Sequence, residues 1–490
     1  MVMIPPSFYP EVLALVFGVL LLVSLVAKPG GVFFKIFYPL AAIGLISCFL
    51  AGIMLFHHAE ETCFYDLLKS SFLFRSVRIS IYFSAILLVR QIFNSHSIQD
   101  KRKRELVFML ALMVFFASML ILSVNLFISF LCLLGLSTAG LFMGGAPFRG
   151  RSEGEAVFKF WYQYSLTMVL GLFSLTLLAF VAGSLDYDAL RGFYAISATH
   201  NLFIFWVMLG LAPMFFLAGL FPFHFITIDR DHGIAWPLQA SETLLISGVG
   251  TISLVKAAVH FFYQEKNIAG EKVLTLLMVL GFVGLLWSIL GAITQKSTKR
   301  FMAFFSAALW SICLITVASP SPQSLATIVY SFLCISISLL LILGGITQLH
   351  EKVGEEENWS TLMGLGGRLP QDSRYVLLGL LSFLFLPPSF GFSVLLNLLG
   401  TMYEQKSLIL ISLTCLAVFL IFMAALRLLS VIYFQDAKSE LGELVPTSGG
   451  NSVVDRLLFV FCAAIVFGFG IWGDALFQSL LASAKIFIIS

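Results

Sequence analysis

Two proline-interrupted apolar stretches decide how this chain folds: Leu220-Phe221-Pro222-Phe223-His224, and Leu386-Pro387-Pro388-Ser389-Phe390-Gly391-Phe392. Proline lacks the backbone donor and its ring clashes with the preceding helical turn, so each stretch predicts an interrupted helix. Irregular backbone at membrane depth persists only where protein covers it or where it lines a wet cavity. A pair of interrupted helices at corresponding places is typical of membrane proteins with two inverted repeats, and two simple proline kinks are the alternative interpretation.

The composition around these stretches is that of a membrane protein. Of the 490 residues, 59% are hydrophobic and 11% are charged, and the mean hydropathy is +0.99. Soluble domains carry about 25% charged residues, so this chain cannot cover a water-facing surface. The composition excludes a secreted disulfide scaffold and a disordered protein, and a net charge of +3 excludes a nucleic-acid binder. We expect one polytopic membrane unit.

The seven cysteines form no metal-binding or cluster motif. No CxxC pair occurs, so neither a zinc site nor an iron–sulfur cluster is indicated, and no haem or flavin motif is present. We therefore expect no catalytic centre, metal or cofactor in this chain. Most of the cysteines lie in apolar runs and are expected to pack as small apolar residues: Cys48, Cys132, Cys313, Cys334, Cys415 and Cys462.

Apolar runs long enough to span a bilayer recur along the chain. A hydrocarbon core of about 30 Å needs roughly 20 apolar residues per helix, and the sequence holds about fourteen such runs. The prediction is an all-α polytopic fold with about fourteen spans and two inverted five-helix repeats, interrupted at Pro222 in span 7 and at Pro387 and Pro388 in span 12. The expected parts are a three-helix segment (1–104), a first repeat with spans 4–8 (105–262), a second repeat with spans 9–13 (263–434), and a loop with span 14 (435–490).

The placement of lysine and arginine predicts the orientation. Loops expected on one side carry most of the cations, including the quartet Lys101-Arg102-Lys103-Arg104, then Lys299 and Arg300, then Arg368 and Arg374. The opposite loops hold scattered cations such as Lys69. Because cytoplasmic loops are enriched in lysine and arginine, we expect a bacterial-type inner membrane protein with both termini on the outer side. The quartet is interpreted as a determinant of topology rather than a lipid-binding site.

Short motifs along the chain carry a resemblance to a known family. They are Pro10-Glu11, Glu155-Ala156 with Lys159-Phe160-Trp161, Pro222-Phe223-His224 with Asp229, Gly233 and Pro237, Gln295 with Lys299-Arg300 and Ala303, and Pro387-Pro388 with Gly391-Phe392. Their order and spacing resemble the antiporter-like subunits of respiratory NADH:quinone oxidoreductase (complex I), above all subunit N, and the related Mrp-type antiporters. The resemblance runs over nearly the whole chain.

The resemblance implies a fold and a role. The fold would have fourteen helices with two inverted repeats, and the role would be proton translocation coupled to electron transfer elsewhere in the complex. The chain would then be a non-redox subunit of a multisubunit translocase. Its partners would be other membrane subunits and lipid.

The sequence departs from the family at the positions of its proton relay. Counting without gaps from the motifs places the family's buried glutamate, three lysines and histidine on Leu134, Leu217, Ser247, Leu395 and Leu309, in that order. The side chains of leucine and serine neither gain nor lose a proton near neutral pH, so we expect no lysine-based relay in this subunit. The alternatives are a transport-incompetent scaffold in a related hydrogenase or carbon-uptake complex, and a free cation/proton antiporter.

The remaining polar residues in apolar runs are proton-path candidates, because burying them is expensive. Lys256, with His260 one turn later, is either a surviving relay or a helix-end lysine that reaches the outer interface. Glu242 is either a replacement acid or a first-turn carboxylate favoured by the helix N-terminus. His224 and Asp229 either gate proton access or anchor a loop as a hydrogen-bonded pair.

Two further groups of charges have expected structural roles. Glu155 and Lys159 stand four residues apart and are expected to pair at the inner end of the sixth span. Arg75, Arg78 and Arg427 need partners in hydrocarbon, which the sequence does not name.

Overall fold

The computed structural model describes residues 5–26, 32–145, 151–196, 200–263, 268–318, 321–353, 358–404, 408–436 and 453–489. Helices make up nearly all of the described chain, which confirms the predicted all-α membrane fold. The chain divides into two compact units. The first contains residues 1–94 and 98–280, and the second contains residues 95–97 and 281–490. The predicted division into four parts stays a prediction.

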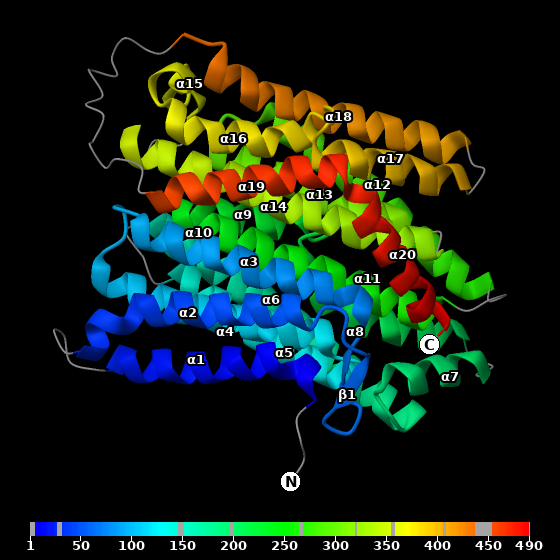
Figure 1. Cartoon of the computed structure of the whole chain (residues 1–490). Coiled ribbons are helices and arrows are strands. Elements are labelled where there is room, and N and C mark those ends of the chain that lie inside the picture. The colour runs from blue at the N-terminus through cyan, green and yellow to red at the C-terminus, as the bar shows by residue number, and fades with distance from the viewer. Residues whose placement is uncertain are drawn as a thin grey trace. The chain divides into compact units, whose positions relative to one another are not determined.

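The first unit begins with three helices and a small hairpin. Its elements are η1 (Pro6–Phe8), α1 (Tyr9–Val26), α2 (Val32–Met54), β1 (Glu61–Cys63), β2 (Leu68–Ser70), α3 (Phe72–Asn94), α4 (Asp100–Leu122), α5 (Leu126–Gly145), α6 (Arg151–Ala182) and α7 (Tyr187–Ile196). The strands pair antiparallel, with Cys63 opposite Leu68. Cys63 and Leu68 pack with Phe8 and Leu122 in a small apolar cluster, which seats the hairpin near the start of α1 (Figure 1).

The first predicted interruption is confirmed. α8 (His200–Ala218) ends before Pro222, and α9 (His224–Gly233) begins after it. Gly219 between them has a φ of +63°, and a Cβ there would lie 2.0 Å from the Thr227 hydroxyl, so the turn requires glycine. The next segment is also irregular. α10 (Trp236–Ser241) passes into a π-helical turn, η2 (Glu242–Gly248), before α11 (Val249–Phe262).

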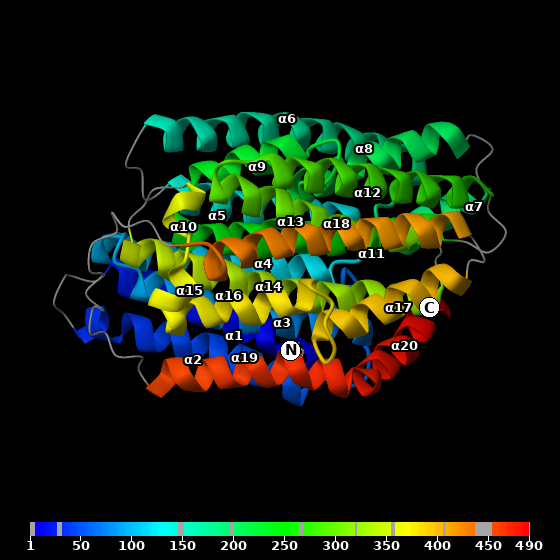
Figure 2. The same ribbon diagram turned by 90° about the horizontal axis from the view of Figure 1, so that it is seen from above.

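The second unit contains the other interruption. After α12 (Ile268–Thr294), which begins in the first unit, its elements are α13 (Thr298–Ile315), η3 (Thr316–Ala318), α14 (Pro322–Val353), η4 (Trp359–Thr361), α15 (Leu365–Arg368), α16 (Pro370–Phe383), α17 (Phe390–Glu404), α18 (Leu408–Tyr433), α19 (Val453–Ile471) and α20 (Gly473–Ile489). α16 stops before Pro387 and Pro388, and α17 continues beyond them (Figure 2). A Cβ on Gly391 would lie 1.7 Å from the Ser382 carbonyl oxygen, so the two half-helices meet too closely for any other residue.

The number of spans can be compared with the prediction. Among the described residues, eleven helices are long and apolar enough to cross a membrane. α19 and α20 form a further pair, bent by 73°. If this pair and each of the two interrupted segments are counted as one span, the total reaches the predicted fourteen. The number fourteen and the inverted repeats stay predictions.

Candidate functional site

A buried ion pair follows the first interruption. Arg230 and Asp231, on α9, are 3% and 0% exposed. The guanidinium approaches Asp231 Oδ1 through Nη2 at 2.7 Å and Nε at 2.9 Å. Nη2 also donates to Ser247 Oγ at 3.3 Å, and the guanidinium lies 5.3 Å from the Phe160 ring centroid. This pair was not among the residues predicted from the sequence.

Glu242 completes the cluster from the π-helical turn. Its side chain is 1% exposed, and Oε2 lies 3.6 Å from Arg230 Nε. Neither carboxyl oxygen accepts a hydrogen bond from any residue that the structure describes. A Cβ on Gly140 of α5 would lie 3.2 and 3.3 Å from the two oxygens, so the carboxyl group packs against the backbone of that helix. We call Arg230, Asp231 and Glu242 the α9–η2 cluster.

Lys256 is also buried in the first unit, but its partners are main-chain carbonyls rather than carboxylates. It is 4% exposed, so protein covers its side chain. Its Nζ donates to the carbonyls of Ile121 at 2.6 Å and Ser123 at 2.8 Å, and lies 5.5 Å from the Phe74 ring centroid. These carbonyls lie at the C-terminal end of α4, where helix carbonyls lack intrahelical donors and attract a cation. Lys256 therefore caps α4.

The other proton-path candidates differ in their burial and in their partners. His260 Nε2 donates to Asp188 Oδ1 at 2.9 Å. Asp188 lies on α7, outside the spanning helices, and this hydrogen bond lowers its pKa below the usual range. His224 is buried and stacks on Phe221, with ring centroids 5.6 Å apart, whereas Asp229 is exposed.

The positions assigned to the missing relay differ in burial. Leu134 is 40% exposed, while Leu133 and Ser137 on the same helix are 1% exposed. The assignment of the family's glutamate position to Leu134 stays a prediction. Leu217 and Leu309 are fully buried, Leu395 is partly exposed, and Ser247 is the hydroxyl that accepts from Arg230.

At the second interruption, neutral polar side chains form the hydrogen bonds among the described residues. Tyr330 Oη lies 2.9 Å from Ser393 Oγ and donates to the Phe469 carbonyl at 3.0 Å, and Asn397 Nδ2 donates to the Ser393 carbonyl at 2.9 Å. In α14, α16 and α17 the charged residues stand close to the helix ends; an example is the ion pair of Lys352 with Asp372 at 2.6 Å.

Arg427, in the second unit, has main-chain partners. Its guanidinium donates to the carbonyls of Ala292 at 3.1 Å, Ile293 and Gln295 at 2.9 Å, at the end of α12. It also lies 4.5 Å from the Trp359 ring centroid. Arg427 therefore caps α12 as Lys256 caps α4.

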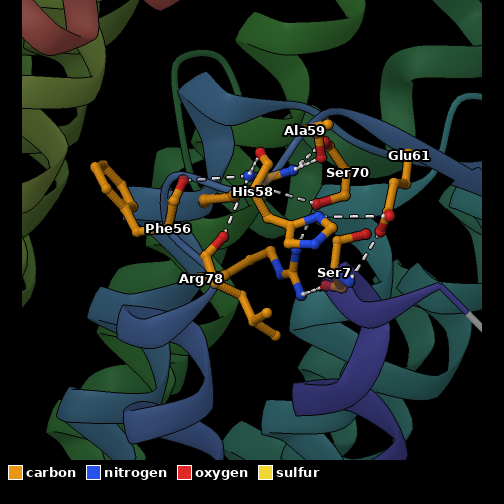
Figure 3. Close-up of polar contacts among 9 residues, drawn as sticks. Ser7, Phe56, His58, Ala59, Glu61, Ser70 and Arg78 are labelled. Carbon is orange, nitrogen blue, oxygen red and sulfur yellow. Dashed lines mark hydrogen bonds and ion pairs between the residues drawn. The ribbon is translucent and has the colours of Figure 1, made fainter.

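The N-terminal helices hold a second buried ion pair. Arg78 donates to Glu11 through Nε at 2.8 Å and Nη2 at 2.6 Å, and Tyr82 Oη donates to Glu11 at 2.8 Å. Arg78 also donates to the Ser7 carbonyl at 3.1 Å (Figure 3). Glu11 is therefore satisfied as a carboxylate, and the pair ties α1 to α3.

Arg75 holds the loop that leads into the hairpin. It donates to the carbonyls of Phe56 at 3.1 Å, His58, and Ala59 at 2.6 Å, which are drawn in Figure 3. Its Nε also donates to Ser70 Oγ at 3.1 Å. On α6, Glu155 and Lys159 form the expected pair at 2.7 Å, with both side chains more than half exposed.

Metal-ligating side chains do not gather within the described ranges. No group of three or more His, Cys, Asp or Glu residues there could hold a metal ion. The prediction that the chain binds no metal or cofactor stays a prediction.

The fold and these charges define a polytopic helical membrane protein with two interrupted helices. The family described as NADH:quinone oxidoreductase/Mrp antiporter, transmembrane, matches residues 123–420, more than half of the chain. The chain therefore belongs to this family, as the motifs predicted.

Curated relatives carry the name of subunit N. The chain is 24% identical over 317 residues to NADH-quinone oxidoreductase subunit N of Halorhodospira halophila, which covers 64% of this chain and 65% of that protein. It is 24% identical over 451 residues to the subunit N of an Azoarcus species, which covers 88% of this chain and 89% of that one. The first of these alignments thus spans slightly less than two thirds of the relative.

Solved structures share the fold. One chain of the membrane-bound sulfane sulfur reductase, an archaeal respiratory membrane complex, aligns with a TM-score of 0.82 at 16% identity, covering 99% of this chain and 98% of that chain. One chain of respiratory complex I from Thermus thermophilus aligns with a TM-score of 0.77 at 17% identity, covering 96% and 99%. Both solved chains come from respiratory complexes.

Proposed function

We propose that this chain is an antiporter-like membrane-arm subunit of a complex I-type NADH:quinone oxidoreductase. Its family and the names of its relatives support this assignment. In this role the chain binds no redox cofactor and has no catalytic centre of its own. It lies in a bacterial inner membrane with both termini on the outer side, as the distribution of loop cations favours.

Its contribution to proton movement is unequal between the two units. One observation carries this proposal: a buried ion pair and a further acid follow the first interruption, whereas the described side chains that hydrogen-bond at the second are hydroxyl and amide groups. A proton relay needs groups that change charge near neutral pH, and Tyr330, Ser393 and Asn397 do not. The second interruption therefore contributes shape and subunit contacts, and the buried charged groups that lie beside an interruption belong to the first unit.

The direct test of the assignment is the identity of the assembly. The tagged chain is purified in mild detergent from membranes of its host, the co-purifying subunits are identified by mass spectrometry, and NADH:quinone activity is measured. We expect membrane subunits and peripheral redox subunits to co-purify with that activity. Co-purification with hydrogenase or carbon-uptake subunits would assign the chain to the alternative assembly, and isolation of the chain alone with antiport activity would make it a free antiporter.

A further inference from the structure

The α9–η2 cluster contains one more acid than base. Arg230 carries one positive charge, whereas Asp231 and Glu242 carry one negative charge each when ionised. All three side chains are at most 4% exposed. An uncompensated charge in a low-dielectric interior is very costly and is usually removed by a proton or by another cation.

Arg230 divides its contacts unequally between the two acids. It contacts Asp231 Oδ1 at 2.7 and 2.9 Å, whereas its nearest approach to Glu242 is 3.6 Å. Thr243 Oγ1 also lies 3.4 Å from Asp231 Oδ2, so the second oxygen of Asp231 has a donor nearby as well. Asp231 is therefore the acid of the cluster that stays ionised, paired with Arg230.

Other charged side chains near Glu242 do not supply the missing cation. Besides the cluster residues, α9 carries His224, Asp229 and His232. The elements that pack most closely against η2 are α4, α5, α8, α10 and α11. α5 and α10 contain no charged residue, and α8 contains His200 at its first position. The charges of α4 fall within its first six residues, 100–105. α11 carries Lys256, which is bound to the α4 carbonyls, and His260, which is bound to Asp188.

We propose that Glu242 is a proton-binding site, which takes up one proton while Arg230 stays paired with Asp231. Protonation makes the α9–η2 cluster neutral, and it suits a carboxyl group whose two oxygens receive no hydrogen bond from the described residues. When the proton leaves, Arg230 is the cation within reach of both carboxylates, so its position between Asp231 and Glu242 reports the protonation state. The inference goes beyond the proposed function, because it holds for whichever assembly contains the chain.

The test is infrared difference spectroscopy on the purified assembly between neutral and alkaline pH. The wild type should show a protonated-carboxyl C=O band that disappears as the pH rises. Glu242→Gln should abolish this band, whereas the matched control Glu155→Gln, which changes an exposed carboxylate on α6, should retain it. Asp231→Asn should also remove the band at neutral pH, because Arg230 then has Glu242 as its remaining carboxylate.

Several outcomes would overturn the proposal. The band could be absent from the wild type, or it could persist in Glu242→Gln. Glutamine has the shape of protonated glutamate, so failure of Glu242→Gln to assemble while Glu155→Gln assembles would show that the site needs the ionised form. Thermal stabilisation by sodium at constant pH and ionic strength, lost in Glu242→Gln, would make the site a metal-cation site instead. The identity of the co-purifying subunits bears on the proposed function alone.

Discussion

The two interrupted helices share a break in the backbone but differ in the side chains that lie beside it. Between α8 and α9 the chain turns at Gly219 and leads into a buried ion pair and an extra carboxyl group. Between α16 and α17 it turns before Gly391 among Tyr330, Ser393 and Asn397, which are neutral. An interrupted helix loses backbone hydrogen bonds in either case. Because the described side chains that hydrogen-bond at the second interruption are neutral, we infer that this break serves the shape of the bundle. The buried charges at the first interruption are then a separate property.

The largest expected effect on stability comes from removing Arg230, the cation of the α9–η2 cluster. Arg230→Gln leaves Asp231 and Glu242 buried without their positive partner, and breaking a buried pair in this way costs about 3–5 kcal/mol. We expect poor recovery of the assembly and a large fall in its melting temperature. Tyr330→Phe, at the second interruption, removes hydrogen bonds between neutral groups and should cost about 1 kcal/mol. Equal losses of stability in the two variants would contradict the proposed difference between the two interruptions.

The next effect tests shape at the second interruption. Gly391→Ala would place a methyl group 1.7 Å from the Ser382 carbonyl oxygen, so α16 and α17 must move apart. Overpacking of this kind costs about 1–3 kcal/mol, and we expect weaker retention of neighbouring subunits on a native gel. The control Gly367→Ala adds a methyl group with nothing within 4 Å and should assemble normally. Normal assembly of Gly391→Ala would argue against a shape requirement there.

A smaller effect is expected at the cap of α4. Lys256→Met removes the cation from the carbonyls of Ile121 and Ser123, and a cation at a partly buried helix C-terminus contributes up to about 2 kcal/mol. Lys159→Met removes an exposed pair, which should contribute about 0.5 kcal/mol or less. Thermal unfolding of the two variants gives the comparison. If Lys256→Met is as stable as the wild type but loses proton pumping, Lys256 is a relay residue rather than a cap.

The smallest effect is a pH dependence outside the spanning helices. The hydrogen bond from His260 lowers the pKa of Asp188 below the usual value of about 3.9. A lowered carboxyl pKa stabilises the folded state above the unfolded pKa, and this contribution disappears as the pH falls through the folded pKa. The melting temperatures of wild type and Asp188→Asn should therefore differ slightly at pH 5–7, and the difference should begin to shrink below about pH 4 and vanish below the lowered folded pKa. The difference should be small, because the Asp188 side chain is 79% exposed and solvent screens the contact. A difference that grows on acidification would contradict this sign.

The sequence predicted the features that depend on local chemistry. Membrane class follows from composition, and both breaks follow from Pro222, Pro387 and Pro388, because the effect of proline on a helix is local. The i,i+4 pair of Glu155 with Lys159 was predictable for the same reason.

The ion pair of Arg230 with Asp231 was not predictable in this way, although Glu242 was a candidate. Asp229, Arg230 and Asp231 are consecutive, and successive side chains on a helix point about 100° apart, so the sequence did not reveal that Asp229 faces out while the next two face in. The partners of Lys256 and Arg427 are main-chain carbonyls, which have no sequence signature.

The central claim is that the second unit carries no proton relay, and one measurement tests it directly. Protons pumped per electron are measured in membranes that contain the assembly with the double variant Tyr330→Phe and Ser393→Ala. Both changes remove hydroxyl groups at the second interruption and keep side-chain size nearly constant. Quantitative immunoblotting checks that the assembly is present at wild-type amounts. We predict an unchanged pumping ratio in the assembled complex. A lower ratio, with assembly and NADH oxidation intact, would contradict the claim, because it would place a proton path through the hydroxyls of the second unit.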